Sequence, residues 1–436
     1  MSDTPVAETK ASEPPTDQPA SGAVTRLFQT GARLFRVTEV DPRLLGMLAA
    51  LVVIWLLFNI LSGGTFLTPR NLWNLSVQTA VVAIMATGMV LVIVTRNIDL
   101  SVGSMLGMIG MAIAILQNEI LPEWLGFDHW AIWIIAVVAA LLIGAVVGAF
   151  QGAIVAYVGV PSFIVTLGGL LVWGGARWAL SSGRTIAPMD ATFQLFGGGA
   201  RGSLGAELSW VIGVLGCVGV VAMLWNGRRQ RRRFEFPLRP MWAEVFLGLV
   251  ACAAILGSIA MLNRYFKPAA LAEGRTDVPF GLAYPVLITL GVALVMTFVA
   301  NRTRFGRYVY AIGGNPEAAE LGGINTKWMI VRTFMLMGIL AAVAAIVQVA
   351  RLNAATSGLG TLAELYVIAA AVIGGTSFSG GIGTIPGAVL GALVMQSLQS
   401  GMVLMGVDAP IQDIVVGIVL VVAVAIDTAY RRRVTR

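Results

Sequence analysis

Long apolar runs, repeated along almost the whole chain, limit most strongly what this sequence can fold into. Of its 436 residues, 57% are hydrophobic and 12% are charged, whereas soluble domains carry about 25% charged residues. A run of roughly 20 apolar residues can cross a bilayer as a helix. The sequence therefore predicts an all-α fold, a polytopic transmembrane helix bundle with about 10 to 12 spans. The candidate spans lie at roughly 44–61, 73–95, 103–117, 131–157, 162–180, 209–225, 241–262, 282–300, 329–349, 363–376, 386–405 and 411–428. Gly144, Gly148 and Gly152, at four-residue spacing, predict a close helix contact.

Basic residues predict the orientation of this bundle. Four arginines precede the first span, which places the N-terminus in the cytoplasm by the positive-inside rule. The arginine-rich loop 226–240, the loop 301–328 and the basic tail 431–436 then fall on the same side, while the acidic stretch 118–128 falls outside. We therefore expect both termini to be cytoplasmic. Residues 1–40, rich in Ala, Pro, Ser and Thr, are expected to form a disordered tail before a transmembrane domain over residues 41–430.

Several kinds of site are disfavoured by residues that the chain lacks. His129 is its only histidine, so a metal site built on histidines is excluded. The sequence has no G-x-x-x-x-G-K-[ST] phosphate loop, so we expect no ATP site of that type and no cofactor in this chain. The net charge of +7 comes from arginines gathered in a few loops and the tail, so it does not indicate nucleic-acid binding. Cys217 and Cys252 both lie in apolar runs, which argues against a disulfide framework.

The stretch 302–328 is the one long polar segment between two membrane-length runs. Pro316 and Glu317 suit the first turn of a short helix, because proline fits there and a carboxylate faces the positive end of the helix dipole. Gly322 or Gly323 can end that helix in a left-handed conformation. A lone short helix is marginal in water, so we expect it to dock on a surface. That surface is either another protein or the chain's own bundle.

Two polar insertions interrupt the apolar pattern. In residues 96–104, Asp99 is either the cap of the next helix in an ordinary turn, or part of a broken helix that lines a pathway. Residues 374–384 are rich in glycine, which indicates either a re-entrant loop or a simple turn.

Charged side chains near the predicted spans give no obvious ion relay. Glu364, Arg351, Asp413 and Asp427 lie near span ends, where snorkelling to the interface explains them. We find no central chain of charged residues like those that ion-coupled transporters use. If the bundle pumps, its energy must come from a partner, and the docking helix is the candidate contact.

Four stretches resemble the permease subunits of bacterial ABC importers for monosaccharides, the ribose/xylose/arabinose permease family, and most closely its D-xylose branch. They are IDLSVGS at 98–104, VPSFIVTLGG at 160–169, FGRYVYAIGGNPEAAELGGIN at 305–325 and VIGGTSFSGGIGTIPGAVLGA at 372–392. Residues 180–280 are poorly covered. Gln151, Tyr366 and Asn97 depart from residues that are common in the family, which affects substrate assignment and not the transporter class.

The resemblance implies a transporter of the bacterial inner membrane and not an enzyme. It implies a homodimer of permeases, a cytoplasmic ATPase subunit that binds ATP, and a periplasmic sugar-binding protein that delivers a monosaccharide. The coupling helix to the ATPase would consist of Asn315, Pro316, Glu317, Ala318, Ala319, Glu320, Leu321, Gly322 and Gly323. Candidate residues of the translocation pathway or its gate are Asp99, Ser101, Gly103, Ser104, Pro161, Phe163, Thr166, Gly374, Gly375, Thr376, Ser377, Gly380 and Gly381.

Two other classes of function remain to be compared with this one. An ion-coupled secondary sugar carrier would import without an ATPase, and the missing charge relay argues against it. A membrane-embedded enzyme would need a group of catalytic side chains in or near the spans, and one histidine with two cysteines in apolar runs gives it little support.

Overall fold

The computed structural model describes residues 42–434 apart from residues 128, 200 and 268–277. The predicted disordered tail, residues 1–40, lies outside this range. In the described part the named elements are all helical, and ten apolar helices are long enough to cross a membrane, so the predicted helix bundle is confirmed. The helices that make these spans are α2 (Pro42–Leu61), α3 (Pro69–Val94), α4 (Val102–Ile115) continued by η1 (Leu116–Ile120) and α5 (Leu121–Leu125), α6 (Ile132–Ala153) continued by η2 (Ile154–Val158), α7 (Ser162–Ser181), α8 (Gly205–Arg233), α9 (Met241–Leu262), α10 (Tyr284–Arg302), α13 (Thr326–Leu352) and α15 (Ile385–Leu404). The remaining elements are η3 (Phe193–Gly197), α11 (Arg304–Gly314), α12 (Pro316–Leu321), α14 (Ala363–Ile373) and α16 (Ala409–Val434).

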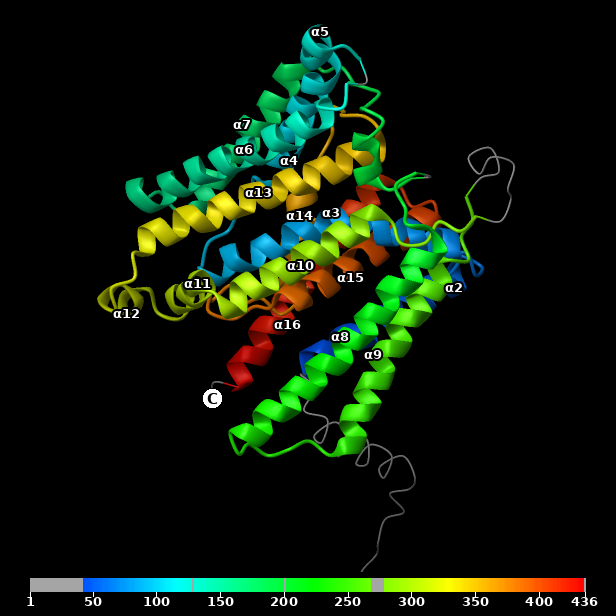
Figure 1. Cartoon of the computed structure of the whole chain (residues 1–436). Coiled ribbons are helices and arrows are strands. Elements are labelled where there is room, and N and C mark those ends of the chain that lie inside the picture. Colours follow the sequence, from blue (N-terminus) through cyan, green and yellow to red (C-terminus); the bar gives the residue numbers. More distant parts are fainter. Residues whose placement is uncertain (1–41, 128, 200, 268–277, 435–436) are drawn as a thin grey trace, which may run out of the picture.

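Helix α3 forms the centre of the bundle, since 94% of the residues in its 18-residue apolar stretch are buried. Helices α10, α13, α14 and α15 pack around it, and α13 also packs along α6 (Figure 1). At the α6–α13 contact a Cβ atom on Gly144 would lie 2.9 Å from Ala342 Cβ, and one on Gly152 would lie 2.9 Å from Phe334 Cβ. The predicted close approach at these glycines is therefore confirmed, because a larger side chain has no room there.

Different contacts between segments hold the two ends of the bundle. At one end the indole of Trp73, in the first turns of α3, donates a hydrogen bond of 3.0 Å to the carbonyl of Gly281, and Gly281 also bridges to Gly205 at the start of α8. At the other end Val94 O accepts a hydrogen bond of 3.0 Å from Gly381 N. Helix α12 lies toward this second end, at the left of Figure 1, and the C-terminal end of α16 also lies on that side of the view.

Several connections are more helical than the sequence analysis expected. The arginine-rich segment 226–240 is not mainly a loop, because α8 continues to Arg233 before the chain turns. Likewise, helical structure continues from α4 to Leu125 through most of 118–128, and α16 carries the backbone of the basic tail as far as Val434. The span expected at 363–376 is only the 11-residue helix α14, which is too short to cross a bilayer.

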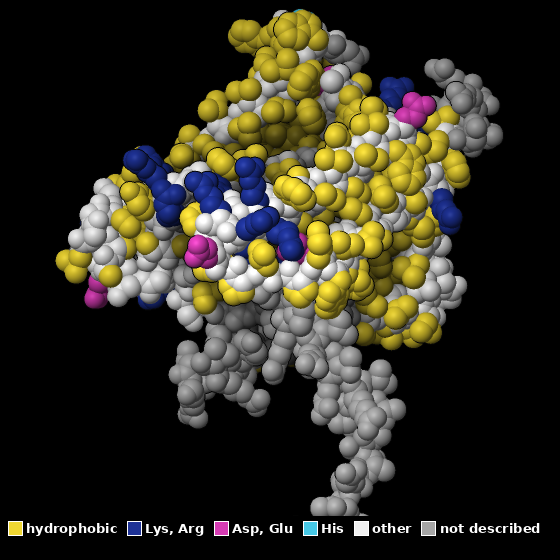
Figure 2. Space-filling model, turned by 60° about the horizontal axis from the view of Figure 1, so that its bottom comes forward, with side chains coloured by type: hydrophobic (Ala, Val, Ile, Leu, Met, Phe, Trp, Pro, Cys, Tyr) yellow, Lys and Arg dark blue, Asp and Glu magenta, His cyan; other side chains and the backbone are white. Residues whose placement is uncertain are grey.

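The surface of the protein divides by chemistry. In Figure 2 most of the visible Lys and Arg side chains gather on the left, the side where α11 and α12 lie in Figure 1. Hydrophobic side chains cover much of the rest of this face. A broad apolar surface of this kind suits contact with lipid.

Candidate translocation site

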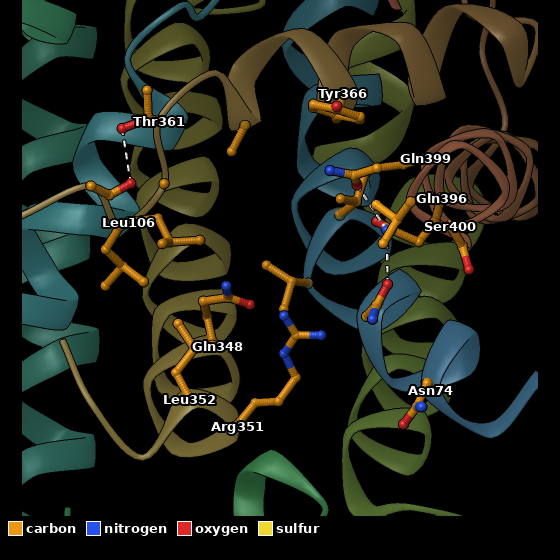
Figure 3. Close-up of a pocket in the computed structure, with 18 of the residues that line it drawn as sticks. Asn74, Leu106, Gln348, Arg351, Leu352, Thr361, Tyr366, Gln396, Gln399 and Ser400 are labelled. Carbon is orange, nitrogen blue, oxygen red and sulfur yellow. Dashed lines mark hydrogen bonds between the residues drawn. The ribbon is translucent and has the colours of Figure 1, made fainter. Parts of the chain in front are cut away.

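A partly open polar cavity of about 620 Å³ lies between α3, α13, α15 and the segment that leads into α14 (Figure 3). Its volume is within the range of roughly 300 to 1,000 Å³ that is typical of small-molecule sites. Most of its polar lining is uncharged. The polar residues that line it are Asn71, Asn74, Gln78, Gln348, Arg351, Thr356, Thr361, Tyr366, Gln396, Gln399 and Ser400.

Helical spacing brings these polar groups onto facing surfaces. On α3, Asn71, Asn74 and Gln78 are three and four residues apart, which places them on one side of the helix. On α15, Gln396 and Gln399 are three residues apart and so also lie on one side of the helix. The Gln396 amide donates hydrogen bonds to Gln399 Oε1 at 2.8 Å and to Gln78 Oε1 at 3.2 Å. Each amide carries both donors and acceptors, as does a set of sugar hydroxyls. The wall is thus able to exchange hydrogen bonds with a neutral polyol.

Among the described residues that line this cavity, only Arg351 is charged. It comes from the last turn of α13, and in Figure 3 its guanidinium points into the open space between Gln348 and the α15 amides. Its Nε atom is buried and has no hydrogen-bond partner in the described structure. The expectation that Arg351 snorkels to the interface is therefore wrong, since the side chain turns inward.

Residues 353–362 form a non-helical segment that closes one side of the cavity. Gly360 has a φ of +76°, and a Cβ on Gly103 at the start of α4 would lie only 2.5 Å from the Gly360 carbonyl oxygen. Arg177 of α7 also contacts this segment, by donating a hydrogen bond to the Leu359 carbonyl. We call residues Leu359–Glu364 the cavity floor.

Glu364, the last residue of the cavity floor, also contradicts the snorkelling interpretation. Its side chain is only 6% exposed, and its Oε2 has no hydrogen-bond partner in the described structure. The positive charge of Arg177, in α7, interacts electrostatically with the Glu364 carboxyl. The sequence analysis missed Arg177, although a lone arginine inside an apolar run is itself a signal of an interior role.

The predicted pathway residues near Asp99 form a buried cluster beyond the floor, in the connection between α3 and α4. Asp99 Oδ1 accepts hydrogen bonds from the backbone and the hydroxyl of Ser101, at 2.9 and 2.6 Å. The Gln151 amide donates to the Ser101 hydroxyl at 3.0 Å, and Thr166 Oγ1 donates to the Ile98 carbonyl at 3.2 Å. Ser101, not Asp99, is the N-cap residue of α4, so the idea that Asp99 caps this helix is wrong.

The Asp99 carboxyl is fully buried, and its second oxygen, Oδ2, has no partner in the described structure. Burial raises the pKa of Asp99 from its ordinary value of 3.8 to about 6, because the hydrogen bonds from Ser101 offset only part of the loss of hydration.

The other predicted pathway residues occupy different places. Ser104 lies on α4 one residue after Gly103, whereas Pro161 and Phe163, at the start of α7, face outward. None of the predicted pathway residues is among those that line the polar cavity. Their part in a pathway stays a prediction.

The glycine-rich segment 374–384 packs against α3 and α11. Thr376 and Ser377 are buried in it, and Gly375, Gly380 and Gly381 all have positive φ angles, which only glycine adopts without strain. Tyr310 of α11 donates a hydrogen bond of 2.7 Å to the Gly383 carbonyl. A Cβ on Gly374 would lie 2.5 Å from Gly387 O, at the start of α15. The segment therefore connects α14 and α15 with the surface helix α11.

Arg96 strengthens this connection from the end of α3. Its guanidinium donates to the carbonyls of Gly313 and Gly314, at 3.0 and 2.8 Å. These carbonyls belong to the last turn of α11, directly before α12. Specific hydrogen bonds thus connect the end of α11, directly before α12, with α3 and with the segment before α15.

The short helix predicted at Pro316 exists, as α12, whereas its docking stays a prediction. Asn315 caps it by accepting a hydrogen bond of 3.0 Å from the Ala318 backbone, and Gly323 beyond its end has a φ of +82°. Ala319 packs inward, whereas Glu317 and Glu320 are exposed and Leu321 is 91% exposed. Leu321 and the two acidic side chains thus face away from the rest of the described chain, and their contact with another protein stays a prediction.

Groups of His, Cys, Asp and Glu that could hold a metal are absent from the described residues. The largest omission of the sequence analysis is the polar cavity itself. The signal was present, since Asn71, Asn74 and Gln78 interrupt the start of an apolar run at helical spacing, as do Gln396, Gln399 and Ser400 near the end of another.

Comparison with known proteins places this architecture in a family. A family model described as "Branched-chain amino acid transport system / permease component" matches residues 71–424. The xylose transport system permease protein XylH of Escherichia coli (strain K12) is 39% identical over 387 residues, which are 89% of this chain and 92% of that protein. XylH of Haemophilus influenzae is 36% identical, over 92% of this chain and all of its own length. The ribose import permease protein RbsC of E. coli (strain K12) is 34% identical, over 87% of this chain and 92% of its own. No solved structure matches the chain. The chain therefore belongs to the family of membrane permease subunits of bacterial ABC importers for monosaccharides.

Proposed function

We propose that this chain is the transmembrane permease of an importer that moves D-xylose or a related pentose into the cytoplasm, driven by a separate ATPase. The observation that carries the proposal is the neutral, hydrogen-bonding lining of the 620 Å³ cavity. Amide and hydroxyl groups from α3 and α15 suit the hydroxyls of a sugar, and a single arginine adds donors without requiring an anion. The similarity to xylose permeases over nearly the whole chain supports the choice of a pentose.

In this proposal the cavity floor separates the sugar from the cytoplasmic side. Gly103 and Gly360 are in backbone contact, so the floor closes without a bulky side chain. For sugar to pass, the Leu359–Glu364 segment moves away from α4. Asp99 and Ser101, which lie beyond the floor, then border the opened path.

Helix α12 connects this gate to the ATPase. A closing ATPase pair pushes on Leu321 and the acidic residues of α12, and the push reaches α3 and residues 374–384 through Arg96 and Tyr310. The open and closed states exist beforehand, and ATP changes their populations. A second copy of the permease, a periplasmic sugar-binding protein and the bacterial inner membrane complete the proposed assembly.

A second candidate function, proton-coupled import without an ATPase, rests on Asp99 and Glu364. Each is buried and has one oxygen without a partner in the described structure. Ionisable groups inside a membrane bundle occur in proton relays. This candidate is weaker, because neither Asp99 nor Glu364 is among the residues that line the polar cavity.

Uptake of labelled xylose distinguishes the two candidates. Cells would carry the permease with its ATPase and binding protein, or with an ATPase that binds ATP without hydrolysing it. We expect uptake to stop with the inactive ATPase and to persist under an uncoupler while ATP is maintained. Uptake by the permease alone that collapses with the uncoupler would instead favour the proton-coupled carrier.

A further inference from the structure

The α8–α9 hairpin extends away from the main bundle, with its turn at the bottom of Figure 1. In each helix only 11% of the residues in the 18-residue apolar stretch are buried inside the protein. The hairpin is attached near its base, where Trp73 of α3 packs against Tyr265 and Phe280 with ring centroids 5.7 and 4.7 Å away. Most of its surface is therefore not covered by the rest of the described chain.

A groove of about 880 Å³ runs along the seam between the two helices. One wall is formed by Val221 and Leu224 of α8, and the other by Val245 and Leu249 of α9. Gly248 lets the two helices come close together, because a Cβ at this position would lie 3.3 Å from Leu224 Cδ1. The part of the groove away from the turn is thus apolar.

The end of the groove near the turn is positively charged. Arg228, Arg229 and Arg232 line it together with a single acidic residue, Glu244. Arg228 is already engaged, since it pairs with Glu244 Oε2 at 2.8 Å and donates to the Arg239 carbonyl at 3.1 Å. Arg229 and Arg232 therefore give this end an excess of positive charge. Trp225, which is 70% exposed, lies about one turn before Arg229.

We propose that this groove binds one anionic phospholipid, with its phosphate at Arg229 and Arg232 and an acyl chain along Val221, Leu224, Val245 and Leu249. The dimensions agree. From Val221 to Arg232 the helix rises roughly 16 Å, which is close to half of the roughly 30 Å hydrocarbon core. Basic pockets between membrane helices are a known arrangement for acidic headgroups, and an interfacial tryptophan stabilises that depth.

The test is native mass spectrometry of the full-length protein released from nanodiscs with equal amounts of phosphatidylglycerol and phosphatidylethanolamine. The wild type is expected to retain phosphatidylglycerol preferentially. Arg229→Gln/Arg232→Gln should bind it about 30-fold more weakly, which corresponds to ~1 kcal/mol for each arginine near the headgroups. Arg229→Lys/Arg232→Lys keeps the charge and should retain most of the preference.

A matched control removes two positive charges from the same end of the hairpin but outside the groove lining, as Arg231→Gln/Arg233→Gln. This variant should bind phosphatidylglycerol like the wild type. An equal loss in the control would overturn the proposal, because it would mean unspecific surface attraction. So would equal retention of both lipids by the wild type, or a dimer mass that disappears only in Arg229→Gln/Arg232→Gln, which would make the groove a contact with a second copy.

Discussion

Replacing Gly103 by alanine tests whether the contact between α4 and the cavity floor acts as a gate. A Cβ at this position would lie 2.5 Å from Gly360 O and 3.1 Å from Glu364 N, and it would also collide with Glu364 Oε2. Two of these three atoms belong to the backbone, so a rotamer change alone cannot relieve the overlap. The floor must move away from α4.

The size of the effect follows from this overlap. Adding a methyl group to a fully packed site costs about 1–3 kcal/mol. If the strain is released when the floor moves, the open state gains roughly 5- to 150-fold in population. Proteoliposomes that contain Gly103→Ala should therefore lose trapped xylose without ATP, faster than the wild type by up to this factor, and the purified protein should melt at a lower temperature.

The matched control is Gly168→Ala on the neighbouring helix α7, where a Cβ would meet no atom within 4 Å. It makes the same chemical change and should leave both leak and melting temperature at the wild-type level. If Gly103→Ala behaves like Gly168→Ala in both assays, the floor is not a closed barrier against α4 and the gate is misplaced.

Replacing Asn315 by alanine removes the acceptor that caps α12, at a cost of about 0.5–2 kcal/mol. The variant should still form the complex, but sugar-loaded binding protein should stimulate its ATPase activity less than in the wild type. Asn315→Asp, which keeps the cap, should behave like the wild type. The folded Asp99 holds its proton up to about pH 6, whereas the unfolded carboxyl releases it near 3.8. The folded state therefore loses about 3 kcal/mol of stability as the pH rises through this window. Asp99→Asn should remove that part of the slope in melting temperature between pH 4 and 7, and an unchanged slope would contradict the assigned burial. Gln396→Leu removes the bonds to Gln78 and Gln399 in the cavity and should slow xylose uptake several-fold at equal expression, whereas Leu398→Met on the same helix should not.

The regular parts of the fold could be predicted because their signals are local. Apolar run length gave the membrane helices, and Asn315-Pro316 followed by Gly322-Gly323 gave the limits of α12. Such features depend on residues close in sequence, so capping and dipole arguments are sufficient.

The cavity and its floor depend on contacts between distant segments, which a single sequence does not reveal. Glu364 and Arg351 lie near the ends of apolar runs, where snorkelling is the usual explanation, and only the inward turn of residues 353–362 makes them interior. The same turn brings Gly360 against Gly103, more than 250 residues earlier in the chain. For Asp99 the sequence left a cap and a pathway role open; the cap depended on local spacing alone, whereas the burial of the carboxyl depends on contacts with distant segments.

The most direct test of the central claim, that α12 transmits the energy of a separate ATPase, is the stimulation of ATP hydrolysis in proteoliposomes. These would contain the permease and its ATPase, with or without xylose-loaded binding protein, as wild type or as Glu317→Lys. We expect the loaded binding protein to stimulate hydrolysis in the wild type and to fail in the variant, with the complex still assembled. Full stimulation in Glu317→Lys would contradict the assignment of α12 as the coupling helix.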